Sequence, residues 1–84
     1  MSDTISPDQI VSLPQQAVGP KYKRVADTIH SAIKSGDLRA GDKLPPVREL
    51  AWSLGITPGT VARAYTLLTD AGHAVAEVGR GTFV

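Results

Sequence analysis

Side chains that could contact a polyanion gather in the middle of the chain and again near its end. Guanidinium groups present planar sets of N–H donors that match phosphate oxygens and the edge of guanine, and threonine hydroxyls can reach either. Residues 56–68 contain no carboxylate that would repel an anion. These types and their grouping indicate contact with a nucleic acid. The candidate residues are Arg48, Thr57, Gly59, Thr60, Arg63, Gly79, Arg80 and Gly81.

The same sequence offers few groups for catalysis. With 84 residues and no cysteine, the chain excludes disulfides, thiol catalysis and zinc fingers of the cysteine type. His30 and His73 have neither metal-ligand spacing nor a partner nucleophile, so we expect them to be structural. The sequence also lacks paired carboxylates, a phosphate-binding loop and a Ser/His/Asp set. We therefore predict that the chain is not an enzyme and holds no metal or cofactor itself.

Charge is distributed unevenly, although the net charge is only +1. Residues 1–20 hold two carboxylates and no Lys or Arg, whereas residues 21–84 hold all nine basic residues and six acids. Because this excess is small, we expect one copy to bind DNA weakly and tight binding to need two copies. The sequence has no apolar run of about 20 residues and no signal peptide, so we expect a cytoplasmic protein with no membrane partner.

The elements that must position the candidate residues are marked by apolar periodicity. Residues 1–20 mix Ser, Asp, Pro and Gln with isolated apolar residues, and we interpret them as a flexible leader. A short strand or amphipathic arm within that leader is the alternative. Residues 21–35 carry an apolar stripe with helical spacing, and Gly36 follows where a left-handed residue ends a helix. Residues 42–44, which precede a proline pair, are expected to be extended.

Two further helices, separated by a short turn, are predicted over residues 46–54 and 58–71. Each has apolar residues at i, i+3, i+4 and i+7, so one face must pack inward. Proline in the first turn costs no hydrogen bond, and Thr57 is a suitable N-cap for the second helix. The apolar positions are Val47, Leu50, Ala51 and Leu54 in the first helix and Val61, Ala64, Tyr65 and Leu68 in the second. This pair is predicted to be a helix-turn-helix whose second helix leaves an acid-free face exposed.

Alternating residues around Gly79-Arg80-Gly81, in the segment 74–84, predict two short strands joined as a hairpin. A helix-turn-helix followed by a β-hairpin is a winged helix. The sequence therefore predicts an α+β domain over residues 21–84, a winged helix-turn-helix with three helices followed by a two-stranded β-hairpin wing.

Three motifs agree in order and spacing with one protein family. They are the pattern I..G.L..GDKLP.VRELA from Ile33 to Ala51, the helix TPGTVARAY and the terminal GRGTFV. Residues 21–84 resemble the DNA-binding domain of GntR-type bacterial transcription regulators. Within that family, the double proline before Val47 and the ending EVGRGTFV look most like the MocR branch, whose members carry a pyridoxal-phosphate-binding, aminotransferase-like domain after the wing.

The resemblance implies a transcription regulator that binds double-stranded operator DNA, with helix 58–71 in the major groove and the Gly79-Arg80-Gly81 wing in the minor groove. It also implies a homodimer in the full-length protein. A small-molecule effector would act through a further domain after Val84, which could hold pyridoxal phosphate. The arginine that matches Arg48 contacts DNA in the family.

The chain departs from the family pattern at three positions. Many members have serine where Pro46 stands and arginines where Pro58 and Ala62 stand, so contacts known at those positions are not transferred. Arg63 is the better candidate for a contact with a base edge or a phosphate. Because it is shifted by one residue, it points about 100° away around the helix from the usual arginine position.

Each candidate also has a plainer explanation. Arg48 could pair with Glu49, Thr57 could serve only as an N-cap, and Gly59 could be tolerated near a helix end. Thr60, Arg63 and Arg80 could simply be solvated, and Trp52 and Tyr65 are expected in the core or at a subunit contact. For the whole domain, the alternative is a winged-helix protein-interaction module that binds no DNA, which should show an apolar exposed recognition helix and an uncharged wing.

Overall fold

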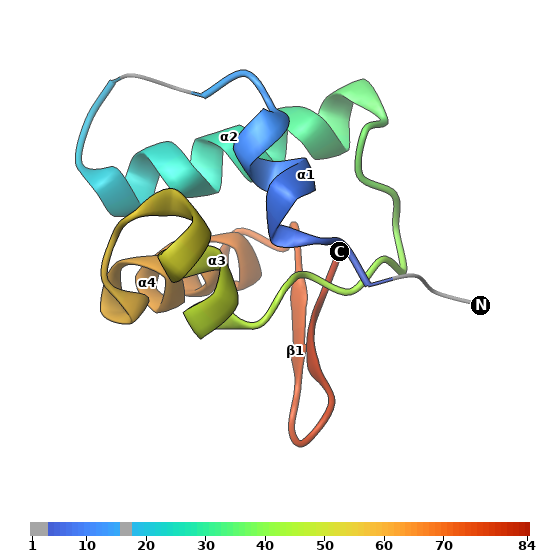
Figure 1. The fold of residues 1–84 in the computed structure, drawn as a ribbon. Coiled ribbons are helices and arrows are strands. Elements are labelled where there is room, and N and C mark those ends of the chain that lie inside the picture. Colours follow the sequence, from blue (N-terminus) through green and yellow to red (C-terminus); the bar gives the residue numbers. More distant parts are fainter. Residues whose placement is uncertain (1–3, 16–17) are drawn as a thin grey trace.

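The computed structural model describes residues 4–15 and 18–84, which form four helices and one two-stranded sheet (Figure 1). In Figure 1, α2 lies across the top of the molecule, α3 and α4 lie below it, and the β1–β2 hairpin projects beyond them. None of the helices described is long and apolar enough to cross a membrane. The elements are α1 (Pro7–Ser12), α2 (Lys21–Ser35), α3 (Val47–Leu54), α4 (Pro58–Asp70), β1 (Val75–Glu77) and β2 (Gly81–Phe83).

The predicted helix-turn-helix is confirmed, and the ends of α2, α3 and α4 lie within one residue of the predicted ones. Gly55 ends α3 in a left-handed conformation, which turns the chain sharply into α4. The apolar stripes of the three helices pack against one another as one core, so burial of apolar surface holds the helices together. The buried residues of α4 are the four predicted ones, Val61, Ala64, Tyr65 and Leu68.

The predicted flexible leader is wrong for residues 4–15, because this segment folds onto the domain. Ile5 and Ile10 are at most 3% exposed and belong to the same core as the later helices. A capping box starts α1: the Ser6 hydroxyl accepts a hydrogen bond from the Gln9 N–H, and the Gln9 side chain accepts one from the Ser6 N–H. The winged-helix class is confirmed, but the described domain has four helices where three were predicted.

A third extended segment anchors the base of the wing. Lys43 forms an antiparallel bridge to Phe83, which confirms the predicted extension of residues 42–44. The Leu44 N–H donates to the Thr82 carbonyl oxygen over 2.8 Å. The wing therefore leaves the core from a fixed base. Its two strands pair antiparallel as Val75–Phe83, Ala76–Thr82 and Glu77–Gly81.

The two aromatic residues of the helix-turn-helix lie in different environments. Tyr65 is buried as predicted, and its hydroxyl donates to the Pro45 carbonyl oxygen over 2.6 Å, which ties α4 to the segment before α3. Burial raises the pKa of the Tyr65 phenol well above its ordinary value, so the group remains a donor. Trp52 is 89% exposed, so its expected place in the core is wrong. A subunit contact for Trp52 stays a prediction.

Candidate nucleic-acid interface

The first turn of α4 presents two linked hydroxyl groups. Thr57 stands at the N-cap as predicted, with extended backbone angles (φ −76°, ψ 149°). Its side chain does not cap the helix within the described structure; its hydroxyl oxygen lies 2.9 Å from the Thr60 hydroxyl oxygen instead. One hydroxyl donates to the other, so the second O–H remains available to a phosphate or a base edge.

Gly59 lies beside these hydroxyls, and the fold gives no reason for a glycine there. A Cβ atom added at Gly59 would have no neighbour within 4 Å among the described residues. The residue is exposed and belongs to a regular helical turn. Alanine at such a position would favour the helix by about 1 kcal/mol. The open space would admit another molecule close to the backbone of α4, and it would equally admit an alanine side chain.

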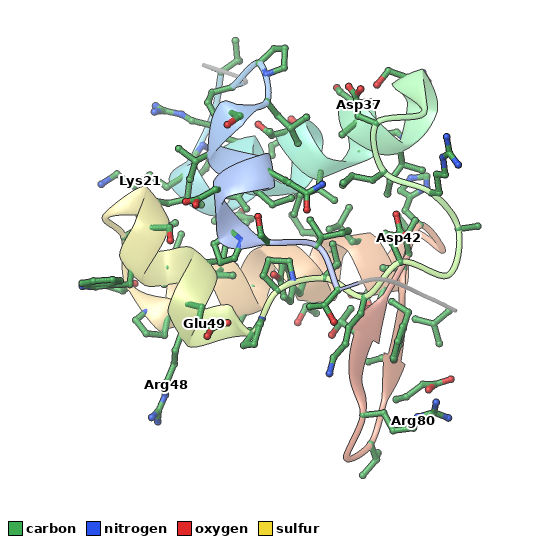
Figure 2. The ribbon with its side chains drawn as sticks, turned by 45° about the vertical axis from the view of Figure 1, so that its right-hand side comes forward. Lys21, Asp37, Asp42, Arg48, Glu49 and Arg80 are labelled. Carbon is green, nitrogen blue, oxygen red and sulfur yellow. The ribbon has the colours of Figure 1, made fainter. Side chains whose placement is uncertain are left out.

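Arg48 lies on α3 and points away from the body of the domain in Figure 2. Its side chain is exposed, and within the described residues it forms no ion pair with Glu49 or another carboxylate. The pairing considered from the sequence is therefore not observed. A guanidinium group without a carboxylate partner is free to bind a phosphate or a guanine in bidentate fashion.

Arg80 lies near the tip of the wing, on the same side of the domain as Arg48 in Figure 2. Gly79 and Gly81 have left-handed backbone angles (φ 75° and 115°), which only glycine adopts without strain. The turn itself spans residues 78–80, one place earlier than the predicted loop 79–81, and Gly81 is the first residue of β2.

The Arg80 guanidinium is not free in the isolated chain. Its Nε atom lies 3.5 Å from Oε2 of Glu77, with the two side chains 74% and 44% exposed. An exposed pair of this kind contributes at most about 1 kcal/mol, so a DNA phosphate can displace the glutamate. Arg80 is therefore exposed, as the plainer explanation expected, but it is also weakly paired with Glu77.

Arg63 is directed differently from the other candidates. It is exposed on the side of α4 opposite the buried stripe, as predicted. Its guanidinium carbon lies 4.2 Å from the centre of the Tyr22 ring, so the group stacks on a residue of α2. In Figure 2 Arg48 and Arg80 both project from the lower side of the domain, one from α3 and the other from the wing, whereas Arg63 lies against Tyr22 of α2.

Two contacts of cationic side chains were not predicted from the sequence: Arg63 with Tyr22, and Lys43 with Gly81. Tyr22 was predicted only as part of the apolar stripe of its helix. Lys43 runs beneath the wing, where a Cβ atom at Gly81 would lie only 2.7 Å from its Cε atom. Neither contact has a local sequence signal, because each joins residues that are brought together only by the packing of separate elements.

Comparison with known proteins identifies the domain. The helix-turn-helix and the anchored β-hairpin define a winged helix-turn-helix of the DNA-binding kind. Residues 21–84 match the model of the family "Bacterial regulatory proteins, gntR family". The match covers most of the chain, and the protein belongs to the GntR family.

Three curated relatives show how far the likeness extends. The chain is 36% identical over 69 residues to the HTH-type transcriptional regulator YhcF of Bacillus subtilis, covering 82% of this chain and 57% of YhcF. It is 44% identical over 66 residues to the vitamin B6 salvage pathway transcriptional repressor PtsJ of Salmonella typhimurium, covering 79% of this chain and 15% of PtsJ. It is 32% identical over 72 residues to the regulatory protein MocR of Rhizobium meliloti, covering 86% and 15%. The chain thus spans only part of each relative.

Two solved structures share the fold. YtrA of Sulfolobus acidocaldarius, a GntR-family transcription factor, superposes with a TM-score of 0.77 at 41% identity, covering 89% of this chain and 79% of YtrA. The AraR DNA-binding domain in complex with operator ORX1 superposes with a TM-score of 0.72 at 32% identity, covering 86% and 92%. The chain is accordingly the winged helix-turn-helix DNA-binding domain of a GntR-family transcription regulator.

Proposed function

We propose that α4 enters the major groove of operator DNA while the wing reaches the adjacent minor groove. The observation that carries this proposal is the first turn of α4, where Gly59 leaves open space beside the paired hydroxyls of Thr57 and Thr60. A helix that presents small and hydroxyl-bearing residues can approach base edges closely. The AraR domain, similar in fold and sequence, has been solved in complex with operator DNA, which supports operator binding by this chain.

The cations that flank α4 then take separate roles. Arg48, free of an ion pair on α3, holds the DNA backbone or a guanine at one edge of the major groove. Arg80 leaves Glu77 and enters the minor groove, whose narrow A·T tracts attract cations. Of these contacts, those of the α4 first turn supply most of the base preference.

A binding assay with the 84-residue chain tests this proposal. A duplex selected by the chain from a random-sequence pool is labelled and titrated with protein at several salt concentrations. A shuffled duplex of the same composition serves as the control. We expect tighter binding to the selected duplex and a linear fall of log affinity with log salt. Equal affinity for both duplexes at every salt concentration would remove sequence recognition from the proposal.

The modest charge of one copy favours a dimer on paired half-sites, because linking two weak sites raises the overall affinity without new contacts. We propose that the full-length regulator is a homodimer in the cytoplasm, with a small-molecule effector bound outside the winged helix. Analytical ultracentrifugation of the full-length protein, with and without operator DNA, measures the first part directly. A monomer that binds one half-site would contradict it.

We also propose that the regulator belongs to the MocR branch and that a following domain holds pyridoxal phosphate. The matches to MocR and PtsJ support this, since each of those proteins is several times longer than the matched segment. The described part of this chain does not fit the cofactor, because its lysines are exposed or half-buried on the surface and none is enclosed. The sequence after Val84 decides the matter: a short effector domain without a pyridoxal-binding lysine would exclude the branch.

A further inference from the structure

Lys43 is held at its backbone by extended segments on both sides. Its carbonyl oxygen accepts a hydrogen bond from the Ile5 N–H over 2.7 Å, and its backbone forms a parallel bridge to Thr4. On the other side it forms the antiparallel bridge to Phe83 in β2. The point from which the lysine side chain starts is therefore fixed at the base of the wing.

The far end of the same side chain lies against the wing. The Lys43 Cε and Nζ atoms are 2.7 and 3.5 Å from the position that a Cβ atom at Gly81 would take. Gly81 is two residues nearer the wing tip than Phe83, the bridge partner of Lys43. Because both ends of the side chain are placed, its direction is known. It runs from the base of the wing toward the tip that carries Arg80, on the lower side of the domain in Figure 2.

The ammonium group of Lys43 has no acidic partner at this place. Glu77, which pairs with Gly81 across the hairpin, is the neighbouring acid, and its carboxylate is bound by Arg80. Within the described residues, Lys43 itself forms no ion pair. The lysine is half-buried, as expected for a side chain that packs its methylene stem on the protein and keeps its ammonium in water. The wing thus carries a second cation that is able to bind an anion.

The position of this cation favours a phosphate over a base edge. The ammonium lies beside Gly81, the residue that directly follows the turn 78–80. If that turn enters the minor groove, a group on the flank of the hairpin meets the strands that border the groove, and these strands present phosphates. An ammonium is also a compact point charge, without the planar donor set with which a guanidinium matches one base.

We propose that Lys43 binds a DNA backbone phosphate at the edge of the minor groove and adds affinity without base preference. The inference rests on the proposed docking of the wing and adds to it a cation from a distant segment of the chain. Arg80 then occupies the groove from the tip of the hairpin, while Lys43 holds one bordering strand from its flank. Gly81 serves this arrangement because it leaves the space that the end of the lysine fills.

The test uses the 84-residue chain and the selected and shuffled duplexes described above. Lys43→Gln is expected to weaken binding to both duplexes by a similar factor, about three- to tenfold, and to lower the salt slope by about 1. Lys43→Arg, which keeps the charge, should bind like the wild type. The matched control is Lys34→Gln, which removes the same charge near the end of α2. Lys34 stands three residues before Asp37, which lies on the upper side of the domain in Figure 2, and its loss should leave the salt slope unchanged.

A Glu77→Gln background separates a phosphate contact from an action of Lys43 through the glutamate. If the lysine binds DNA directly, Lys43→Gln weakens binding by the same factor in this background as in the wild type. Binding is measured below the thermal unfolding midpoint of every variant, so that loss of the fold does not contribute.

Three results would overturn the inference: a loss that disappears in the Glu77→Gln background, a change in preference at one base pair, or an unchanged affinity and salt slope in Lys43→Gln. The proposed docking of the wing is tested separately by Arg80→Ala. If Arg80→Ala keeps wild-type affinity and slope, that docking fails; if only Lys43→Gln keeps them, the docking stands and the role of Lys43 is refuted.

Discussion

The α3–α4 pair is backed by the core along its length, whereas the β1–β2 hairpin is fixed only at its base. The turn between the helices packs against buried residues, and the Tyr65 hydroxyl links α4 to Pro45. The wing tip carries fully exposed Val78 and an arginine held by one exposed ion pair. The helix-turn-helix therefore presents its side chains from a backbone that is already ordered, and the wing must lose conformational freedom when it binds.

The largest effect is expected for a variant that removes core packing from the helix-turn-helix and leaves the wing unchanged. Leu50 is completely buried in α3, so Leu50→Ala should lower the free energy of unfolding by about 2–5 kcal/mol and abolish binding through loss of the fold. Val78→Ala, at the exposed wing tip, should leave the unfolding midpoint unchanged. Urea denaturation followed by circular dichroism measures both. Similar midpoints for the two variants would show that α3 is not supported as described.

The second largest effect is expected on DNA affinity when Arg48, the cation of α3, is removed. Arg48→Ala should weaken binding to the selected duplex by on the order of tenfold or more, because a guanidinium that is carried by a packed helix and has no competing carboxylate is lost. Fluorescence anisotropy measures the affinity. Glu49→Gln, a neighbouring change on the same helix, is the control and should bind at least as well as the wild type. An Arg48→Ala variant with wild-type affinity would take α3 out of the interface.

A smaller effect is expected for the cation of the wing. Arg80 must leave Glu77 and order the hairpin tip, so Arg80→Ala should weaken binding by only about three- to tenfold and lower the salt slope by about 1. Glu77→Gln should bind slightly tighter, since it releases the arginine. The salt titration distinguishes the two variants. If Arg80→Ala weakened DNA binding more than Arg48→Ala, the wing and not the α3–α4 pair would be the stronger contact, which would contradict the comparison.

The smallest effect is expected for Gly59→Ala, which should make the domain more stable and its DNA binding weaker. Gly59→Ala should raise the free energy of unfolding by about 0.5–1 kcal/mol, because alanine favours an exposed helical position. The same methyl group should weaken binding if DNA approaches the first turn of α4 closely. Thermal unfolding and anisotropy on one preparation give both numbers. An alanine variant that gains stability and keeps full affinity would mean that Gly59 is merely tolerated.

Much of the fold was predictable because its signals are local. The stripes of α2, α3 and α4 and the turn residues between them specified those helices to within one residue. The failure lies in residues 4–15, where Ile5 and Ile10 are too few to show a period, although the capping pair Ser6 and Gln9 was a usable signal for the start of α1. The core alternative for Trp52 was wrong because a large aromatic residue favours burial on average, and here its helix turns it to solvent.

The candidate site was predicted as a set of residues but not as a set of contacts. The exposure of Arg48 and Arg63 and the left-handed glycines of the wing follow from helical spacing and hairpin chemistry. The Glu77 partner of Arg80 and the hydroxyl link of Thr57 could not be read from spacing. Each depends on side-chain conformations that several local arrangements would satisfy equally well.

The sequence by itself determined which apolar stripes of α2, α3 and α4 face inward, where these helices end and that a hairpin turn would carry Arg80 between two glycines. These follow from periods of a few residues and from the backbone preferences of proline and glycine. Only the tertiary structure decided that an N-terminal helix closes the core, that Lys43 supports the wing and that Tyr22 holds Arg63. Such contacts join elements far apart along the chain, and they exist only because burial of the shared core brings those elements together.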